Sequence, residues 1–441
     1  MEGFKKYYKK SWSERLEVLE KQEILSQEDI DRLKSQAIDV SLGETQIENF
    51  ITQYLLPEGL ALNYVINGKE YLIPMVTEEP SVIAASSHGA GIVKKSGGFK
   101  ASVKQRLMLG QVIVEKIEDV DKFEDDILKN EDELLEIANQ AHPSIVRRGG
   151  GARWIRVRKL DKSIVSIDLA VDVQEAMGAN MLNTMLEAIA ATIREKYEQD
   201  VVMSILSNYA TECLATAICD IPVASLTKNG MSGEKIAEKI AQASYIAQID
   251  PYRATTHNKG IMNGIDGVVI ASGNDWRAIE AGAHAYAAKD GNYRGLSTWK
   301  VIGDTLHGEI TLPLPLGSVG GSIGIVPLVK VNHKLLEIEN AIELEKVVAS
   351  VGLGQNLAAL YALVTEGIQK GHMRLQLKSL VSSIGATEEE IPLVVSELEK
   401  LNKRDMSTAK EILDNLRKLS HIHDDIIVRV PLIPGNNDRR N

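Results

Sequence analysis

The amino-acid sequence predicts a mixed α+β fold with more than one domain. Its 441 residues suggest two to three domains with ample hydrophobic core. The amino-acid composition of the chain changes near residue 110 and again after Asp220, where glycine and alanine become frequent. Between these points a strand hairpin, a helix and another strand follow one another. This order favours an α+β module over an alternating βαβ sheet.

The N-terminal region has the pattern of surface helices. The segment Ser11–Glu14 has the form of a capping box, and Leu16 and Leu19 follow at roughly helical spacing. Further along, residues 81–90 are rich in small side chains and are preceded by Pro80. A proline fits the first turn of a helix because its missing N–H costs nothing there, so a helix is expected to begin at this point.

The module between residues 110 and 220 is predicted segment by segment. Dense charge indicates an exposed helical region, and clustered glycines indicate a loop after it. Two stretches then alternate between apolar and polar residues on either side of Asp161–Ser163, which is typical of a hairpin. An amphipathic helix and an apolar strand complete the module. In order, these elements cover residues 116–136, 147–153, 155–160, 165–173, 182–197 and 201–206.

The most informative segment runs from residue 250 to residue 277. The apolar run Val268–Ala271 lies between glycines, a pattern that predicts a buried strand. Polar side chains gathered at both ends of a buried strand are expected where a site is built on a rigid element. These side chains are Arg253, His257, Lys259, Asn263 and Asp275. From about residue 385 a charged helical tail is expected.

Composition narrows the function classes. The formal net charge of −11 disfavours a nucleic-acid-binding protein, which needs a basic face, but a small basic cluster is enough for a phosphate-bearing ligand. Cys213 and Cys219 lack metal-site spacing and are expected to be reduced packing thiols. No apolar run is expected to reach the length of a membrane span, and residues 1–10 lack the apolar core of a signal peptide. A cytoplasmic enzyme is therefore the default expectation.

Each candidate site residue, taken alone, also has a structural explanation. Glu79 stands just before a helix start and would complement its dipole. Lys259 would be an ordinary solvated lysine, and Asp275 would cap the helix after Trp276. His372 would be an ordinary surface or capping histidine.

The glycine-rich segments are similarly open to two interpretations. The pair Arg147 and Arg148, beside three glycines, would form either a phosphate site or a solvated turn. Residues 317–324 contain glycines like those of a dinucleotide fingerprint, but the strand–helix context of that motif is missing. Residues 175–180 open a helix whose free amides point at an anion, as those of any helix start do.

Five segments together carry a family resemblance. They are residues 78–85, 175–180, 250–264, 273–277 and 371–373. From about residue 47 to residue 373 the chain resembles the bacterial soluble, class II, 3-hydroxy-3-methylglutaryl-coenzyme A (HMG-CoA) reductases. The resemblance implies a large α/β-rich substrate domain at 1–109 and 220–374. It also implies an inserted small ferredoxin-like, non-Rossmann, NAD(P)-binding domain at 110–219 and a helical C-terminal lid, or flap domain, at 375–441.

The resemblance also implies roles for individual residues, with no metal among them. The implied catalytic residues are Glu79, Lys259, Asp275 and His372. The implied contacts to the substrate are Ser81, Arg253 and Asn263. The implied contacts to the dinucleotide are Met177, Gly178, Asn180 and Asn208.

The chemistry of these residue types agrees with those roles. Reduction of a thioester to an alcohol needs two hydrides, and Lys259 would stabilise the carbonyl oxygen as negative charge develops on it. A neighbouring carboxylate favours the protonated form of a carboxyl group, so Glu79 beside Asp275 is a sensible acid, while Asp275 would hold Lys259 charged. His372 would protonate the departing thiolate under a closing lid, and Arg253 offers a fork for the substrate carboxylate.

The expected cofactor is NADPH, with NADH as the weaker alternative. In the NAD-using, degradative members of the family an aspartate stands about a dozen residues before the position that Trp154 occupies here. His142 stands at that place in this chain. Without that carboxylate, and with Arg147 and Arg148 nearby, a ribose 2′-phosphate should be accommodated. NADPH in turn suggests reductive use in a mevalonate pathway of isoprenoid biosynthesis.

The resemblance implies HMG-CoA and mevalonate as ligands. It also implies a homodimer with shared active sites, or a higher oligomer, and no nucleic-acid or membrane partner. Two rival functions remain open at this point. One is an NAD-dependent enzyme that runs in the oxidative, mevalonate-degrading direction. The other is a non-catalytic acyl-CoA or dinucleotide-binding protein on the same fold, against which the full catalytic quartet argues.

Overall fold

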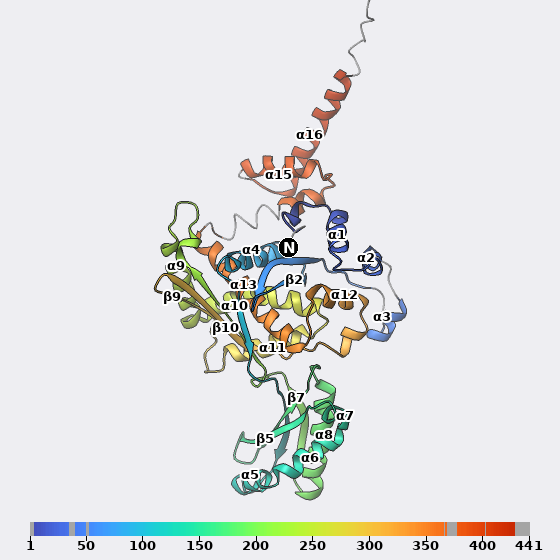
Figure 1. The fold of residues 1–441 in the computed structure, drawn as a ribbon, viewed down its shortest axis with the longest axis vertical. Coiled ribbons are helices and arrows are strands. Elements are labelled where there is room, and N and C mark those ends of the chain that lie inside the picture. The colour runs from blue at the N-terminus through green and yellow to red at the C-terminus, as the bar shows by residue number, and fades with distance from the viewer. Residues whose placement is uncertain are drawn as a thin grey trace, which may run out of the picture. The chain divides into compact units, whose positions relative to one another are not determined.

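The chain forms two separate units in the computed structural model. The model describes residues 4–34, 40–49, 53–365, 367, 377–401 and 403–427. The first unit is Met1–Thr365 and the second is Glu366–Asn441. Every strand of the described chain belongs to the first unit, which is a mixed α+β structure as predicted (Figure 1).

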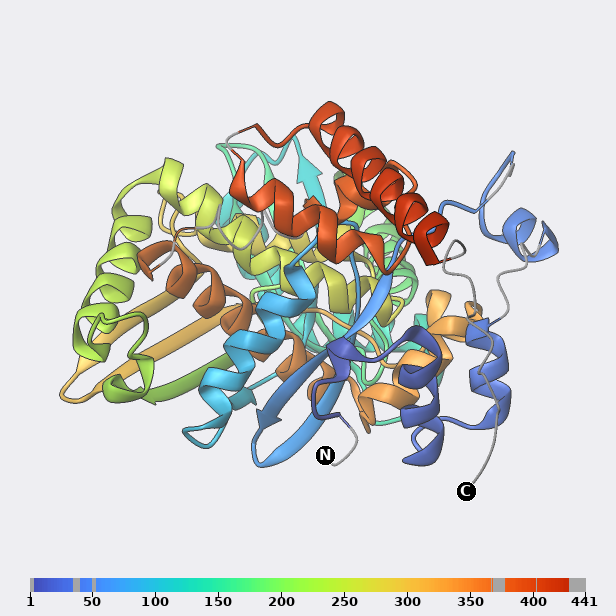
Figure 2. The same ribbon diagram turned by 90° about the horizontal axis from the view of Figure 1, so that it is seen from above.

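The larger core of the first unit contains two antiparallel sheets. One is a hairpin, and the other has four strands in the order β3-β8-β10-β9. Helix α9 (Gly233–Ile249) lies along the four-stranded sheet, as Figure 2 shows. The strands are β1 (Glu58–Ile66), β2 (Lys69–Val76), β3 (Lys100–Val103), β8 (Leu214–Pro222), β9 (Ser297–Ile302) and β10 (Thr305–Pro313).

Two long helices, α10 (Pro251–Ala271) and α13 (Ala341–Thr365), cross this core side by side. The prediction of a strand at Val268–Ala271 is therefore wrong, because this run is the last turn of α10. The glycines that suggested strand ends serve close packing instead. A Cβ on Gly264 would lie 2.9 Å from the side chain of Gln355 in α13, and one on Gly267 would lie 3.1 Å from the side chain of Met75 in β2.

Helix α13 also corrects the expectation that no apolar run reaches the length of a membrane span. It is long and apolar enough to cross a bilayer, and no other helix of the described residues meets that test. However, 78% of its most apolar stretch is buried inside the protein. It packs against α4 (Val82–Lys94), α10 and the four-stranded sheet. Helix α13 is therefore a core helix that is apolar on all sides because protein surrounds it.

The stretch from β4 to β7 forms a second core with the element order β-α-β-β-α-β. Its sheet is antiparallel throughout, in the order β5-β6-β4-β7. This confirms the predicted charged helices, hairpin, amphipathic helix and final strand; β4 was not predicted. The elements are β4 (Met108–Glu115), α5 (Val120–Lys129), α6 (Glu131–Ala141), α7 (Pro143–Val146), β5 (Gly151–Lys159), β6 (Val165–Asp172), α8 (Ala179–Lys196) and β7 (Asp200–Ser207).

The remaining elements are helical. The predicted capping box is confirmed, since Ser11 and Glu14 bond each other reciprocally at the start of α1. Pro80 is not in a first turn as predicted, because α4 begins at Val82 with Ser81 as its N-cap. The other helices of the first unit are η1 (Tyr7–Lys9), α1 (Trp12–Lys21), α2 (Gln27–Lys34), α3 (Val40–Gln46), η2 (Val223–Leu226), α11 (Trp276–Ala287), η3 (Gly321–Gly324) and α12 (Pro327–Leu336).

The second unit confirms the predicted helical tail. Residues 377–383 are helical, followed by α15 (Glu390–Lys400) and α16 (Met406–Ile427). Apolar side chains of these three segments form a small core of their own, which includes Leu377, Val394 and Leu413. The two predicted packing thiols lie in the first unit, where Cys213 and Cys219 are both free and buried.

Candidate active site

One face of α10 carries the candidate polar residues. Asp250 caps the helix by accepting hydrogen bonds from the backbone N–H groups of Tyr252 and Arg253, at 3.1 and 3.2 Å. Lys259 and Asn263 follow on this partly exposed face, four residues apart and therefore one turn from each other. The opposite faces of α10 are buried against α13 and β2. A rigid core helix thus holds the two side chains at fixed positions.

Lys259 and Glu79 form the centre of this site. The Lys259 Nζ lies 2.5 Å from a carboxylate oxygen of Glu79, although 180 residues separate them in the chain. The backbone N–H of Glu79 donates to the Thr77 hydroxyl at 3.2 Å, which fixes the turn between β2 and α4. The lysine side chain is 59% exposed and the glutamate side chain 33% exposed, so a ligand can reach both groups.

Ser81 has two unusual features at this turn. Its φ of 80° places a non-glycine residue in the left-handed region, which costs free energy. Its hydroxyl oxygen is buried, and the described part of the chain offers it no hydrogen-bond partner. A strained residue with an unsatisfied buried hydroxyl is typical of a ligand-binding position.

Arg253 lies half-buried near the start of α10, where burial lowers the pKa of its guanidinium. No described residue forms a hydrogen bond or ion pair with this side chain. An Arg fork without a partner is suited to a carboxylate ligand. Asn263, one turn beyond Lys259, is half-buried.

His257 belongs to the core rather than to the open face. Its Nε2 lies 2.8 Å from the Ser297 hydroxyl and 3.3 Å from the Asn356 side-chain nitrogen. Burial, with a smaller effect of the Arg253 charge, lowers the pKa of His257 to about 3, so the ring is neutral near pH 7. The histidine supports the helix from behind.

Asp275 is the N-cap of α11, as the structural alternative for it predicted. Its carboxylate accepts hydrogen bonds from the backbone N–H groups of Arg277 and Ala278, at 3.0 and 3.3 Å, and lies 3.1 Å from the Arg277 guanidinium. Within the described residues no hydrogen bond or ion pair joins Asp275 to Glu79 or Lys259. The structure therefore brings Glu79 and Lys259 together, while the arrangement with Asp275 beside them stays a prediction.

Hydrogen bonds connect Asn274, the neighbour of Asp275, to the segment that leads into α8 and carries the candidate dinucleotide contacts. The Asn274 side chain accepts from the Gly317 N–H at 2.8 Å and donates to the Gly317 carbonyl at 3.1 Å. The next N–H, that of Ser318, donates to the carbonyl of Glu175 at 2.8 Å. A Cβ on Gly317 would lie 2.8 Å from the backbone nitrogen of Met177, so only glycine fits here. Sequence reasoning missed Asn274, although its place beside Asp275 was a usable signal.

The candidate dinucleotide contacts lie at the start of α8 and the end of β7. Gly178 is the N-cap of α8, with a left-handed φ of 85°, and Asn180 is exposed in the first turn. Asn208 is exposed just beyond β7, and its carbonyl oxygen would lie 2.6 Å from a Cβ on Gly282 in α11. The free N–H groups at this helix start are suited to a phosphate.

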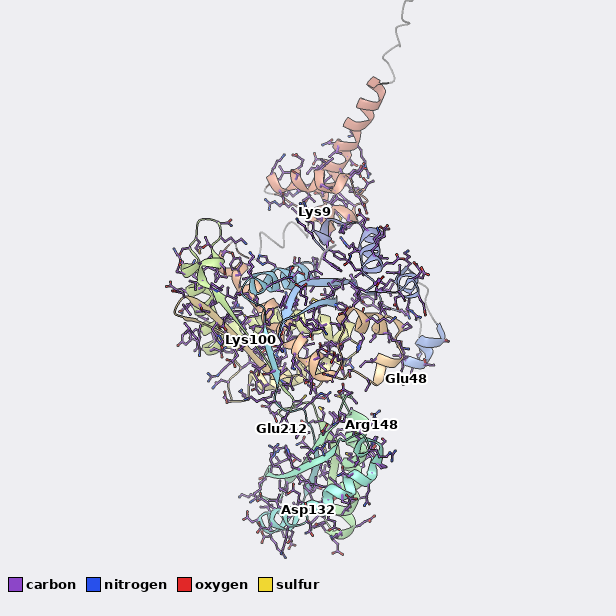
Figure 3. The ribbon with its side chains drawn as sticks, viewed as in Figure 1. Lys9, Glu48, Lys100, Asp132, Arg148 and Glu212 are labelled. Atoms are coloured by element: carbon purple, nitrogen blue, oxygen red, sulfur yellow. The ribbon has the colours of Figure 1, made fainter. Side chains whose placement is uncertain are left out.

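The candidate 2′-phosphate residues lie together around α7. His142 precedes α7, and its Nδ1 lies 3.2 Å from the Ser144 hydroxyl. The Arg148 Nε donates to the Ser144 carbonyl at 3.2 Å. Arg147 and Arg148 are both exposed; Arg148 is labelled in Figure 3. The two exposed arginines are compatible with either a solvated turn or a phosphate site, so their contact with a 2′-phosphate stays a prediction.

Two further features complete the description of the site. His372, the fourth candidate catalytic residue, lies outside the described residues. In the described part of the chain no group of three or more His, Cys, Asp or Glu side chains could hold a metal ion.

A buried ion pair joins the second core to the larger one. The Arg106 Nε lies 2.7 Å from the Glu345 carboxylate. The guanidinium also donates to the backbone carbonyls of Gln174, Ala176 and Leu316. The Gln174 and Ala176 carbonyls flank Glu175 in the segment that leads to α8, so this pair fixes the approach to the candidate dinucleotide turn.

Comparisons with known proteins agree with the sequence resemblance. The family model described as hydroxymethylglutaryl-coenzyme A reductase matches residues 11–377. The chain is 42% identical to the 3-hydroxy-3-methylglutaryl-coenzyme A reductase of Archaeoglobus fulgidus over 93% of this chain and 94% of the relative. It is 34% identical to the probable reductase of Borreliella burgdorferi over 84% of this chain and 86% of that relative.

Solved structures of a Streptococcus pneumoniae enzyme are also similar. One structure of its 3-hydroxy-3-methylglutaryl-coenzyme A reductase has a TM-score of 0.81 and 48% identity, and covers 94% of this chain and 99% of that chain. Another, of the class II enzyme bound to NADPH in open conformations, has a TM-score of 0.79 and 49% identity. It covers 92% of this chain and 100% of that chain.

Proposed function

The chain belongs to the hydroxymethylglutaryl-coenzyme A reductase family, and on that premise we propose the residues and the cofactor with which it works. Its activity is the NAD(P)-dependent reduction of HMG-CoA to mevalonate and free CoA, a step of the mevalonate pathway. This is a four-electron reaction that passes through mevaldyl-CoA and mevaldehyde. The observation that carries the assignment of roles is the open Lys259–Glu79 pair.

Lys259 stabilises the substrate oxygen as each hydride arrives. Its ammonium group is exposed, and among the described residues Glu79 is its anionic partner, so a developing oxyanion can take the place of Glu79. Glu79, once it has taken up a proton and left its ion pair with Lys259, protonates the oxygen, and Asp275 keeps the lysine charged. Ser81, Arg253 and Asn263 hold the carboxylate end of the substrate. Support for these contacts comes from the buried Ser81 hydroxyl and from the Arg253 fork, neither of which forms a hydrogen bond within the described residues.

The cofactor is NADPH, which supplies the hydrides when bound. Met177, Gly178, Asn180 and Asn208 hold the dinucleotide at the start of α8. His142, Arg147 and Arg148 receive the 2′-phosphate. In support, these three side chains lie around one short turn with no carboxylate among them. The relative from Streptococcus pneumoniae, at 49% identity, is described as bound to NADPH.

The domain roles follow from the same premise. Residues 110–219 are the cofactor domain, 1–109 with 220–374 the substrate domain, and 375–441 a flap that closes over the site. The enzyme is a homodimer with shared active sites, in the cytoplasm. A large subunit interface fits the exposed apolar side chains near the start of α10, where Ile249 is 62% and Tyr252 87% exposed.

The test of the activity is the stoichiometry of nicotinamide oxidation. Purified protein is given limiting HMG-CoA with excess NADPH, and the loss of nicotinamide absorbance is followed to completion. Two equivalents of NADPH should be oxidised per HMG-CoA, with mevalonate and CoA as products. One equivalent consumed, with an aldehyde as the end product, would refute the four-electron reaction. A parallel run with NADH, and one with mevalonate, CoA and NAD⁺, tests the oxidative alternative.

His372 is proposed as the acid that protonates the departing CoA thiolate. The variant His372→Ala should slow the conversion of HMG-CoA by about a hundredfold, in line with the loss of one general acid. Reduction of free mevaldehyde should be spared, because that reaction releases no thiolate. Steady-state rates on both substrates make the measurement. Equal losses on the two substrates would show that His372 has another role.

A further inference from the structure

A chain of ionisable side chains leads away from the candidate active site along α10 and α11. Asp266 of α10 and Glu280 of α11 lie within hydrogen-bonding reach of each other. The Glu280 carboxylate is 2.5 Å from the His284 Nε2, and the His284 Nδ1 is 2.7 Å from the Tyr293 hydroxyl. None of these four groups has a role in the reaction as described so far.

The inner end of this chain lies on α10, the helix that carries Lys259 and Asn263. Asp266 lies on the same face of α10 as Lys259 and Asn263, at steps of four and three residues, so each step is about one helical turn of 5.4 Å. At the next residue, Gly267, helix α10 passes close to β2, because a Cβ there would lie 3.1 Å from the side chain of Met75 and 3.5 Å from the carbonyl oxygen of Val76. Glu79 follows Val76 by three residues. Asp266 and Glu79 therefore belong to segments that lie next to each other.

The outer end of the chain opens to solvent. The His284 side chain is 39% exposed, whereas one carboxyl oxygen of Asp266 is buried, and the described residues offer it no hydrogen-bond donor. Two carboxyl groups in contact, with no cation between them, favour retention of one proton by the pair. Burial, and then the Glu280 charge, raise the pKa of Asp266 well above its usual range. Hydrogen bonding to His284 lowers the pKa of Glu280.

We propose that Asp266, Glu280 and His284 form a proton relay that recharges Glu79 from solvent during turnover. This inference rests on the proposed role of Glu79. When Glu79 gives its proton to the substrate oxygen, the O–H bond of Asp266 breaks and a new O–H bond forms at Glu79 through a chain of water molecules along α10. Glu280 and His284 then pass a proton from solvent water back to Asp266. No electrons are transferred in these steps.

The relay matters because the overall reduction consumes two protons per HMG-CoA. In the free site solvent reaches Glu79 directly, since a third of that side chain is exposed. In the proposed binding mode, substrate and nicotinamide cover that opening. A second route through the helix pair then supplies protons without opening the site. Met75 and Val76 of β2 lie against Gly267 of α10, and among the described residues Tyr293 contacts the outer end of the relay through its hydroxyl on His284.

The experiment compares two single variants, His284→Ala and Asp266→Asn, with the wild-type enzyme. Either variant should lower kcat for HMG-CoA at least tenfold, while KM values for HMG-CoA and NADPH change less than twofold. The solvent deuterium isotope effect on kcat should increase in both. Added imidazole should restore the rate of His284→Ala in a saturable manner, because a small diffusible base can carry protons to the gap left by the side chain. It should not rescue Asp266→Asn, whose defect is buried.

The matched control is His307→Ala. His307 is also a partly exposed histidine bonded to a carboxylate, that of Asp220 at 2.7 Å, but it lies in β10, and no hydrogen bond or ion pair of the described residues joins it to this chain. This variant should keep its kcat and show no response to imidazole. If His284→Ala keeps a normal kcat and isotope effect, or loses rate that imidazole does not restore, the relay is refuted. The rates of all variants are compared with the rate of the wild-type enzyme. If the proposed function is wrong, the wild-type enzyme itself is inactive, and this result is distinct from a failure of the relay.

Discussion

Two ion pairs of similar length occupy opposite environments in the first unit. Arg106 and Glu345 meet at 2.7 Å with side chains that are 7% and 0% exposed. Lys259 and Glu79 meet at 2.5 Å with side chains that are 59% and 33% exposed. The first pair sits at the junction between the two hydrophobic cores, and the second sits in the candidate active site. Their contact distances are alike, so the surroundings decide what each pair can do.

The surroundings of the two pairs differ in the number of other partners. The Arg106 guanidinium is also satisfied by three backbone carbonyls, and the Cys213 sulfur lies 3.5 Å from the Glu345 carboxylate. Such a pair cannot exchange partners without leaving a buried charge uncompensated. Lys259 has Glu79 alone as its partner in the described structure, and water reaches both groups. The junction pair is therefore a fixed support, and the site pair is free to receive a ligand.

The largest expected effect is on stability, at the junction. The variant Arg106→Ala leaves the Glu345 carboxylate buried without its cation, and should lower the free energy of unfolding by about 3–5 kcal/mol. Urea unfolding followed by circular dichroism measures it. The control is Lys94→Ala, which breaks the partly exposed pair between Lys94 and Glu70 at 2.6 Å. That loss should be under about 1 kcal/mol. Equal losses of unfolding free energy in the two variants would show that burial does not decide how much these ion pairs stabilise the fold.

The next effect is on catalysis, at the site. The variant Lys259→Ala should lower turnover of HMG-CoA by about a hundredfold or more, since one lost oxyanion partner costs on the order of 3 kcal/mol in the barrier. Its stability should change by less than about 1 kcal/mol, because the pair is exposed. Steady-state kinetics and urea unfolding of the same preparation give both numbers. Near-normal turnover would remove Lys259 from the mechanism.

A smaller effect is expected at the other exposed cationic cluster, around α7. A charge-assisted contact to the 2′-phosphate contributes about 1.5–3 kcal/mol, so the protein should prefer NADPH over NADH by roughly ten- to a hundredfold in kcat/KM. The variant His142→Asp should erase or reverse this preference, mainly by weakening NADPH. A wild-type preference for NADH would favour the degradative alternative. An unchanged ratio in the variant would place the discriminating residues elsewhere.

The smallest effect is a pH dependence of the junction. Burial raises the pKa of Glu345 to about 7 in spite of Arg106. The folded protein then holds a proton that the unfolded chain releases, so the free energy of unfolding should fall as the pH rises. The fall from this group between pH 6 and 7.5 should be about 1 kcal/mol. Unfolding measured across this range in wild type and Glu345→Gln checks it, and identical slopes would show that Glu345 does not titrate there.

The fold of the second core was more predictable than that of the first. In β5, β6 and α8 the side chains alternate or repeat with the period of the element, and one face is polar, so the pattern is readable. Helix α10 has no such signal along its last turns. Val268–Ala271 is buried on nearly every side, and periodicity alone cannot separate a buried helix from a buried strand. The flanking glycines suggested the ends of a strand. That interpretation was wrong because these glycines allow close helix packing.

The site was predictable as a set of residues and less so as a geometry. Family motifs pointed to Glu79 and Lys259, and the structure brings them into contact across 180 residues. Local patterns also foretold that Asp275 caps a helix. The Asp266–Glu280 contact was not foreseen, because each acid belongs to an ordinary helical segment and only the packing of α10 on α11 brings them together. A single sequence gives little information on the contacts between secondary-structure elements.

The position of α13 near the end of the first unit has a consequence for the newly made chain. Strands and helices from β1 to β10 pack on α13, yet residues 341–365 leave the ribosome after all of them. The larger core therefore stays open until α13 has been synthesised. The second core is complete within residues 108–213, and domains fold as units during synthesis. We expect the inserted segment to fold first on the ribosome, while the site that depends on α10 is assembled only when α13 arrives.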